Sequence, residues 1–588
     1  MDFFSMLSMI GGLALFLYGM EGMGAGLAKV SGGRLEKILE NLTSSKLRGV
    51  LLGLGVTAVI QSSSATTVMV VGFVNSGIMK LGQAVGVIMG ANIGTTVTSW
   101  LLSLTGIESG NFFIKLLKPT SFSPILAIIG VGLMMFSKKQ KKKDIGSIMI
   151  GFAVLMFGME MMSSAVKPLA DVPEFTNFMV KFTNPILGMI AGAVLTAIIQ
   201  SSSASVGILQ ALCATGSVTF GTAIPIIMGQ NIGTCITAML SSVGASKNAK
   251  RAAFVHLYFN LLGTIAFMII FYGANALIHF AFLKDSADVM GIAVVHSCFN
   301  VFATLLLYPL SRGLEKLAVL TVKDVEGDVV ETDDFQTLDL RFLDRPGLAI
   351  QHCRDLAIKM SELSKDALFR SFSLLNKYDE KQAKRIEELE ARVDRYEDEL
   401  GSYMVKIGGK DLSETDNHTL SILLHTIGDF ERISDHALNI QQSAKEMFEK
   451  NLSFSEKAAA EVEVFTEAIK DIISLAFDSF KNQDIEMAKS VEPLEEVIDN
   501  LQARIKKRHV QRLREGTCTI ELGFVLSDLL TSYERVADHC SNIAVDMIQI
   551  VADGYETHGY LEEVKHGDSE QFEKSYKAFK EKYQLPQK

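Results

Sequence analysis

The first half of the chain contains long apolar runs, whereas the second half alternates apolar and charged positions at helical spacing. Apolar runs of about 20 residues predict membrane-spanning helices, because that length crosses the hydrocarbon core of a bilayer. The first run has neither a basic start nor a small-residue cleavage site, which favours a retained span over a signal peptide. The runs lie at residues 3–27, 47–79, 82–105, 122–136, 146–166, 186–218, 220–243, 252–283 and 289–310.

Two of these runs, 47–79 and 186–218, are longer than one span, and a Gln-Ser-Ser-Ser cluster interrupts each of them. Polar residues at membrane depth line a cavity or are buried inside the protein. The interruptions therefore mark candidate sites. The alternative is that the serines only join neighbouring helices, as polar residues in membrane helices often do.

The interruptions belong to an internal repeat, because residues 12–101 align with residues 151–240 without a gap at an offset of 139. TAVIQSSSA at 57–65 matches TAIIQSSSA at 196–204, and IMGANIGT at 88–95 matches IMGQNIGT at 227–234. A duplicated, interrupted helix predicts the midplane binding site of a secondary transporter. The glycines at 90, 94, 229 and 233 have a simpler explanation, which is close approach of two backbones.

Neither polar cluster contains Lys or Arg, and the next basic residues are Lys80 and Lys247. An anion bound there would be held by hydroxyl groups and by backbone N–H groups at the N-termini of half-helices. Two such termini supply roughly one positive charge in total, which leaves a divalent anion under-compensated. A co-bound hard cation such as Na⁺ would correct this. The pattern predicts cation-coupled transport of a small anion.

The paired QSSSA and GxNIGT motifs resemble the type II sodium–phosphate cotransporter family over about residues 5–310. The resemblance implies an all-α polytopic transporter with two inverted repeats, re-entrant helical hairpins and elevator-type alternating access. It also implies that phosphate and Na⁺ bind between the hairpins. The residues that match the family's substrate and sodium site are Gln61, Ser62, Ser63, Ser64, Asn92, Thr95, Gln200, Ser201, Ser202, Ser203, Asn231 and Thr234.

The segments 256–260 and 296–300 resemble the family's HxxFN segments, with one departure. Animal relatives that move net charge have an Asp directly after the His of one segment, whereas this chain has Leu257 and Ser297. The departure favours electroneutral coupling. The histidines themselves are more typical of helix packing than of ligation.

Charge divides the chain into a basic part, 1–320, and an acidic part, 321–588. The basic part contains 21 Lys and Arg against 12 Asp and Glu, whereas the acidic part contains 35 against 54. An acidic polar half excludes a nucleic-acid partner. The expected domains are a membrane domain at 1–316, a polar linker at 317–346 and a helical domain at 347–588. The basic run at 138–143 predicts a cytoplasmic loop.

The acidic half contains a second repeat, because ERISDH at 431–436 recurs as ERVADH at 534–539. Glu and Asp four positions apart share one face of a helix and repel each other unless a cation compensates. This pattern resembles the PhoU family, which implies two three-helix bundles, a cytoplasmic regulatory role and metal sites. The metal's identity stays open, and a solvated charged face is the alternative. The matching residues are Glu390, Asp394, Glu431, Asp435, Glu495, Asp499, Glu534 and Asp538.

Together with these patterns, the two resemblances imply a sodium-coupled phosphate symporter in a bacterial inner membrane, with multiple spans and a cytoplasmic PhoU-like regulator. An enzyme is not expected, because no nucleophile–base pair or Walker motif is found. The alternatives are a phosphate exporter, a symporter of another oxyanion or a dicarboxylate, and a sensor that binds phosphate without transporting it. The six cysteines lack CxxC spacing, so neither disulfides nor a zinc site are expected. A homodimer, the direction of transport and the ion stoichiometry stay open.

Overall fold

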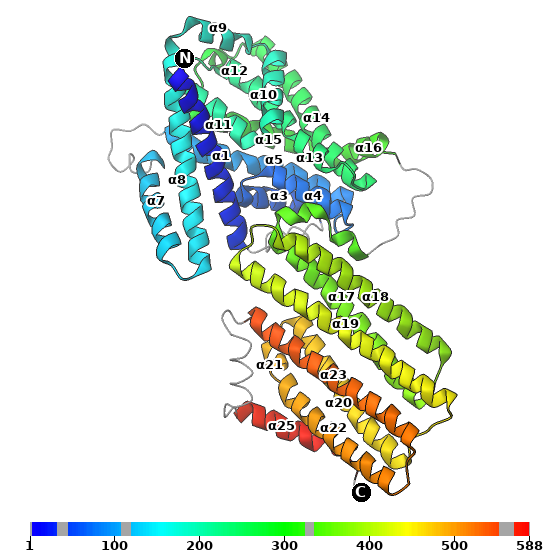
Figure 1. The fold of residues 1–588 in the computed structure, drawn as a ribbon. Coiled ribbons are helices and arrows are strands. Elements are labelled where there is room, and N and C mark those ends of the chain that lie inside the picture. Colours follow the sequence, from blue (N-terminus) through cyan, green and yellow to red (C-terminus); the bar gives the residue numbers. More distant parts are fainter. Residues whose placement is uncertain (1–2, 32–44, 107–118, 324–333, 552–569, 587–588) are drawn as a thin grey trace. The chain divides into compact units, whose positions relative to one another are not determined.

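The computed structural model describes residues 3–31, 45–106, 119–323, 334–551 and 570–586 (Figure 1). These residues are built from helices, and a single β-bridge between Thr219 and Ser286 is the only strand-like pairing among them. The all-α prediction is therefore confirmed over the described chain. The chain forms two compact units, Met1–Leu348 and Ala349–Lys588, which are described separately.

The first unit contains the membrane-spanning candidates. Six of its described helical stretches are long and apolar enough to cross a membrane, or seven if a pair bent by 99° is counted as one span. That pair is α9 (Pro173–Lys181) with α10 (Pro185–Ile199). The other long helices are α1 (Phe3–Ser31), α5 (Leu81–Ser103), α8 (Gln140–Val166), α12 (Phe220–Gly233) followed by α13 (Cys235–Ser241), α14 (Lys247–Ile278) and α15 (Val289–Leu307); α7 (Pro119–Phe136) and α16 (Ser311–Thr321) are shorter.

The two interrupted runs each form a pair of short helices. The first pair is α3 (Lys46–Ile60) and α4 (Ser63–Asn75), and the second is α10 and α11 (Ser202–Cys213). Helices of 12 to 15 residues extend about 18–23 Å, which is short of the roughly 30 Å hydrocarbon core. The members of each pair contact each other. We refer to α3–α4 as hairpin 1 and to α10–α11 as hairpin 2.

Glycines allow each hairpin to pack closely on the helix that follows it. A side chain added at Gly90 of α5 would overlap the carbonyl oxygen of Val50 on α3, and one at Gly229 of α12 would overlap that of Met189 on α10. The repeat aligns Gly90 with Gly229 and Val50 with Met189. The close-approach explanation of these glycines is therefore correct, and it applies to equivalent positions in the two repeats.

The first helices of the two repeats, α1 and α8, also pack through glycines. A Cβ at Gly19 would lie 2.6 Å from the carbonyl oxygen of Gly151, and a Cβ at Gly151 would lie 2.9 Å from that of Gly19. Gly12 and Gly158 make the corresponding contact. Gly12 and Gly19 are the repeat equivalents of Gly151 and Gly158. The contact is therefore reciprocal, as in a two-fold interface.

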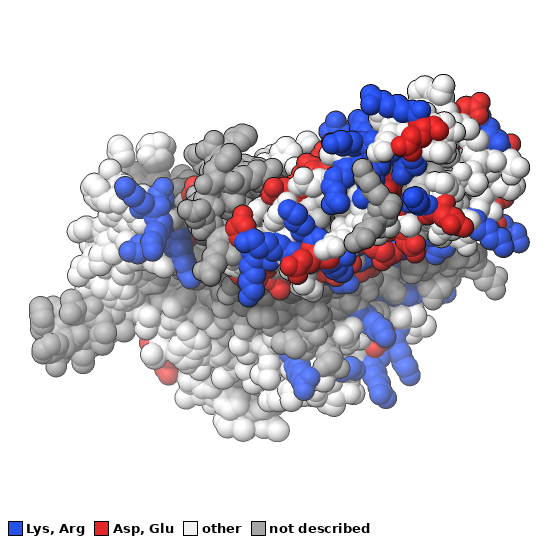
Figure 2. Space-filling model, turned by 90° about the horizontal axis from the view of Figure 1, so that it is seen from below, with Lys and Arg blue, Asp and Glu red and all other residues white. Residues whose placement is uncertain are grey.

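The second unit consists of two sets of three long helices followed by a short C-terminal helix. The surface in Figure 2 carries Lys and Arg next to Asp and Glu, as expected of solvated helices. The first set is α17 (Pro346–Asn376), α18 (Glu380–Gly408) and α19 (Glu414–Glu449). The second set is α20 (Glu456–Asn482), α22 (Val491–Arg514) and α23 (Ile520–Val551), with α21 (Ile485–Ala488) between the first two and α25 (Glu570–Lys582) at the end.

Aromatic contacts join the two sets in a reciprocal way. Phe430 of α19 packs on Phe477 of α20 with ring centroids 5.0 Å apart. Tyr533 of α23, which is equivalent to Phe430, packs on Phe372 of α17 with centroids 5.4 Å apart. All four rings are buried. The core of this unit therefore joins the two sets to each other.

The segment expected to be a polar linker is more ordered than its composition suggests. Helix α16 extends to Thr321, and the 3-10 turns η4 (Asp334–Thr337) and η5 (Leu340–Asp344) follow, whereas residues 324–333 lie outside the described chain. Phe342 of η5 is fully buried against α4. Residues 334–344 therefore pack as part of the first unit.

Candidate functional site

Both QSSS clusters form the same backbone structure. Gln61 ends α3 and Gln200 ends α10, with φ values of 60° and 58° in the left-handed region. Their N–H groups donate to the carbonyls of Thr57 and Thr196 at 2.8 and 2.7 Å. A glutamine rarely adopts this conformation, and residues that do so are concentrated at functional sites. The two repeats thus share not only their sequence but also this unusual backbone conformation.

The serine after each glutamine caps the next helix. Ser62 accepts a hydrogen bond from the Ala65 N–H at 3.1 Å, and Ser201 accepts one from the Ala204 N–H at 3.2 Å. The first-turn N–H groups of Ser63 and Ser64, and those of Ser202 and Ser203, have no acceptor within their own helix. Each tip therefore directs backbone donors and the positive end of a helix dipole toward one point, which suits an anion.

The side chains of the two tips differ. Gln61 is buried, and its Oε1 accepts a hydrogen bond from the Thr98 hydroxyl of α5 at 2.9 Å. Gln200 is exposed, and Thr237, the repeat equivalent of Thr98, instead donates to the carbonyl of Thr234. The sequence analysis did not single out Thr98. It lies three residues after Thr95 on the same helix, so helical spacing from the GxNIGT motif was the available signal.

The GxNIGT residues also form matching structures. The side-chain amides of Asn92 and Asn231 donate to carbonyls four residues earlier, at 2.9 and 3.0 Å. The hydroxyls of Thr95 and Thr234 do the same at 3.0 and 2.9 Å. All four residues are buried. Each of these four side chains therefore donates one hydrogen bond within its own helix and is buried in the protein interior.

The two HxxFN segments place buried polar atoms beside these helices. His296 of α15 contacts the Ser99 hydroxyl of α5 at 2.8 Å, and Asn260 of α14 donates to the Cys235 sulfur at 3.3 Å. Among the described residues, neither ring nitrogen of His256 has a hydrogen-bond partner, and the side-chain oxygens of Asn260 and Asn300 also lack one. Buried polar atoms are usually paired, so these atoms are candidates for contact with a water molecule or an ion.

Helix α5 connects these features. Both α4 and α11, the half-helices that begin at the two tips, contact α5, as do α14 and α15. Gln210 of α11 donates to the carbonyls of Ser99 and Val289 at 3.1 and 2.8 Å, which links α11 to α5 and α15. Gln210 is not among the residues predicted from the sequence, because a single glutamine in an apolar helix belongs to no motif.

In the second unit, the predicted acidic pairs lie on four helices: α18, α19, α22 and α23. The Glu431 carboxyl is half-buried and near other carboxylates, so desolvation, reinforced by Asp435, raises its pKa to about 7. Desolvation, with the nearby carboxylates of Asp394 and Asp435, also raises the pKa of Glu390. Arg432 partly offsets this repulsion through its contact with Asp435, and Arg535 makes the corresponding contact with Asp538 in the other repeat, each at 3.3 Å.

Family models match both units. The model of the Na⁺/Pi-cotransporter matches residues 15–164 and again residues 154–292. The PhoU domain model matches residues 357–444 and residues 463–547. The chain belongs to the Na⁺/Pi-cotransporter family and carries a C-terminal PhoU domain. The family consists of phosphate transporters located in membranes, not of enzymes.

Two relatives with similar sequences agree with this assignment. The chain is 24% identical over 563 residues to the Escherichia coli (strain K12) protein named "Putative inorganic phosphate export protein YjbB", covering 93% of this chain and 98% of that protein. It is 40% identical over 92 residues to human sodium-dependent phosphate transport protein 2B, which covers 15% of this chain and 13% of that protein. PhoU from Pseudomonas aeruginosa, a solved structure, matches 37% of this chain and 98% of its own at 21% identity, with a TM-score of 0.30.

The PhoU domain contains carboxylates of the kind that bind metal ions, but in the part of the chain that the structure describes they do not form a complete set of ligands around one point. Carboxylate oxygens suit hard cations, and a cation among them would relieve the repulsion that raises the pKa of Glu431. Within the described residues, however, no group of three or more His, Cys, Asp or Glu side chains is positioned to hold a metal ion. Metal binding by these eight carboxylates remains a prediction.

Proposed function

We propose that this chain is a Na⁺-coupled phosphate transporter of a bacterial inner membrane, regulated by a cytoplasmic PhoU domain. One observation carries the proposal. The two hairpin tips, at equivalent positions of the repeat, have the same left-handed glutamine and the same capping serine. Two equivalent anion-binding helix ends in one transport domain suit a small oxyanion that both repeats bind together.

Within this proposal, the N–H groups and hydroxyls of Ser63, Ser64, Ser202 and Ser203 bind the phosphate oxygens. Phosphate carries about one to two negative charges near pH 7, and two helix ends supply roughly one positive charge. Because no Lys or Arg lies in either tip, Na⁺ supplies the remainder. The side-chain oxygens of Gln61, Gln200, Asn92, Asn231, Thr95 and Thr234 are hard donors that suit this ion.

Alternating access then requires that the two repeats present the tips to opposite sides of the membrane in turn. We infer an elevator-type movement of the inverted hairpins with the helices packed on them. The reciprocal glycine contacts between α1 and α8 support a two-fold relation between the repeats. Gln200, which is exposed while Gln61 is buried, supports inequivalent states of the two tips.

Export is the second candidate, and the name of the Escherichia coli relative favours it. A binding site defines the substrate and the coupling ion, but the gradients determine the direction of net flux. The symporter and the exporter can therefore be distinguished by measuring phosphate flux in each direction under a defined Na⁺ gradient.

Purified protein in liposomes tests both. Labelled phosphate uptake is measured with an inward Na⁺ gradient and with K⁺ in its place, and efflux from loaded vesicles is measured with the gradient reversed. Uptake that requires Na⁺ supports the symporter. Efflux without a Na⁺ requirement supports the exporter, and phosphate binding without flux in either direction supports a sensor.

For the PhoU domain we propose metal binding at the acidic pairs. Added Mn²⁺ or Fe²⁺ is expected to raise the unfolding temperature of this domain, and the double variant Glu431→Gln, Asp435→Asn is expected to reduce the shift. An equal shift in wild type and variant would assign the effect to other sites.

A further inference from the structure

The stretch that leads to the PhoU domain docks on hairpin 1. We call residues 334–344 the connector. Its Phe342 is fully buried, and the ring packs against Phe73 of α4 with centroids 5.4 Å apart. Gly72 of α4 provides the space, because a Cβ there would lie 2.7 Å from Cε1 of Phe342. The Phe342 ring therefore fits against α4 only because residue 72 has no side chain.

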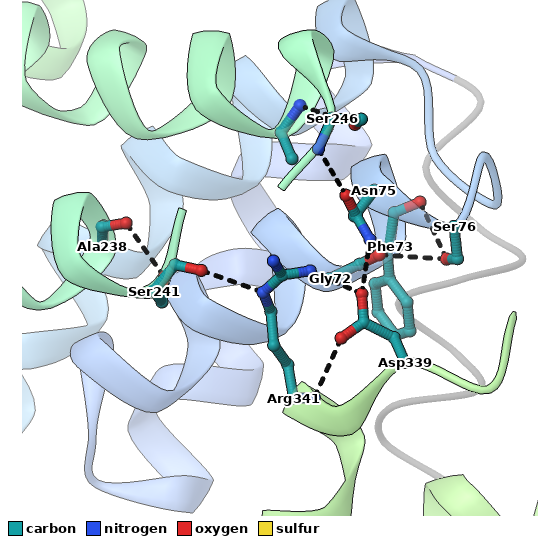
Figure 3. Close-up of polar contacts among 10 residues, drawn as sticks. Gly72, Phe73, Asn75, Ser76, Ala238, Ser241, Ser246, Asp339 and Arg341 are labelled. Carbon is teal, nitrogen blue, oxygen red and sulfur yellow. Dashed lines mark hydrogen bonds and ion pairs between the residues drawn. The ribbon is translucent and has the colours of Figure 1, made fainter. Parts of the chain in front are cut away.

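Polar contacts join Asp339 and Arg341 of the connector to Asn75 of α4 (Figure 3). The Asp339 side chain is only 6% exposed, and its Oδ2 accepts hydrogen bonds from Asn75 Nδ2 at 2.6 Å and from Arg341 Nη1 at 2.5 Å. Asn75 is the last residue of α4. Removing one partner of such a carboxylate is costly, because it leaves a buried charge without compensation.

The same contacts extend to a third element, the turn between α13 and α14. Arg341 Nε donates to the carbonyl of Ser241, the last residue of α13, at 2.9 Å. The Asn75 side-chain oxygen accepts from the N–H of Ser246, which caps α14, at 2.8 Å. The connector therefore ties the end of hairpin 1 to the α13–α14 turn.

Hairpin 2 is tied differently. The segment that follows α11 is held by Ser286, whose hydroxyl donates to the carbonyl of Gly216 at 3.0 Å, and by Ala287, whose N–H donates to the carbonyl of Val218 at 2.8 Å. Both residues lie between membrane helices of the transport domain. The tie on hairpin 1 comes instead from the chain segment that continues into the PhoU domain.

We propose that the connector is an inhibitory latch through which the PhoU domain controls transport. Only Arg345 separates η5 from α17, so a displacement of α17 pulls directly on Phe342 and Asp339. At its other end, α4 begins at the phosphate-binding tip, 13 residues away. The latched connector holds α4 against the α13–α14 turn and slows the movement of hairpin 1. Release frees the hairpin and raises flux. This inference rests on the proposed transport function.

The test compares Gly72→Ala with Gly55→Ala in the full chain. A Cβ at Gly72 meets the Phe342 ring, whereas Gly55 of α3, in the same hairpin, has open space around it. Hydrogen exchange of the peptide containing residues 334–345 reports docking, and labelled-phosphate flux in liposomes reports transport. We expect faster exchange of this peptide and about fivefold higher maximal flux in Gly72→Ala, with Gly55→Ala at wild-type values.

Asp339→Asn serves as a second variant, because it removes the charge outside the aromatic contact and keeps the side chain's size. Unchanged exchange elsewhere in the chain confirms that each variant is folded. Faster peptide exchange with unchanged or lower flux overturns the latch alone, and unchanged exchange in both variants overturns the docking itself. Absence of flux in wild type and in every variant overturns the proposed function, and the latch with it.

Discussion

Gln61 and Gln200 share a left-handed backbone conformation, with φ values of 60° and 58°, at equivalent positions of two repeats. Glycine is the usual residue for this conformation, because side chains there clash with the backbone. The chain has glutamine at both positions. The side chain at each tip is therefore expected to have a function that offsets its conformational cost.

Replacing Gln200 by Gly separates the side chain from the backbone. Glycine adopts the left-handed conformation without strain, but it adds flexibility to the unfolded chain, so the free energy of unfolding should stay within about 1 kcal/mol of wild type. Phosphate flux should nevertheless be lost. Thermal unfolding in detergent and liposome flux measure the two effects, and a Gln200→Gly variant that transports normally would show that the side chain is dispensable.

Charge at the cap of α4 should decide whether an anion binds. Asn and Asp cap a helix about as well as Ser, so Ser62→Asn and Ser62→Asp should both fold. The added carboxylate of Ser62→Asp lies at the helix end proposed to hold phosphate and should repel it. We expect labelled-phosphate binding to be abolished by Asp and retained by Asn. Equal binding in the two variants would place the anion elsewhere.

Gly229→Ala should disrupt the packing of hairpin 2 on α12. The new methyl group would overlap the Met189 carbonyl, and overpacking of this kind costs about 1–3 kcal/mol or more. Gly55→Ala, which meets open space, is the matched control. Unfolding temperatures in detergent should fall for Gly229→Ala only. Equal values would mean that the two helices can separate without loss.

Stability of the PhoU domain should depend on the protonation of Asp546. Burial raises the pKa of this carboxyl to about 7, although a hydrogen bond from Thr426 at 3.0 Å opposes the shift. The folded state therefore holds a proton that the unfolded state releases near pH 4. Stability should fall as pH rises from about 4 to about 7, by at most about 4 kcal/mol.

Asp546→Asn should remove the part of the pH dependence that Asp546 causes, leave the part due to Glu431, and stabilise the domain at pH 8. Calorimetric unfolding between pH 5 and pH 8 measures it, with the exposed Asp528→Asn of the same helix as the control. If the slope is the same in Asp546→Asn and in wild type, another group causes the dependence.

Much of this architecture could be predicted from the sequence, because it depends on repetition. The repeat aligned the two tips, and the structure places Gln61 and Gln200 at the same helix ends. The glycines at 90 and 229 predicted close approach of two backbones, and they lie where α5 packs on α3 and α12 packs on α10. The left-handed glutamines followed no local rule, since the conformation is imposed by the helices on either side of each tip.

The connector could not be predicted in the same way. Acidic, basic and apolar residues alternate in it without a clear helical or strand period, and nothing in this pattern distinguishes Phe342 from the neighbouring Leu340 and Leu343. The burial of Phe342 depends on Gly72 and Asn75, which lie far earlier in the chain. Neither residue belongs to a motif. Contacts between distant, unrepeated positions leave no pattern in a single sequence.

The central claim is that both tips bind the transported phosphate together, and phosphate flux in liposomes under a Na⁺ gradient tests it most directly. Wild type is compared with Gln61→Ala, Gln200→Ala and Gln483→Ala. Gln483 is a left-handed glutamine in the PhoU domain and controls for the loss of this residue type. We predict that each tip variant reduces flux by about tenfold or more while Gln483→Ala keeps it. Wild-type flux in either tip variant would contradict the shared site.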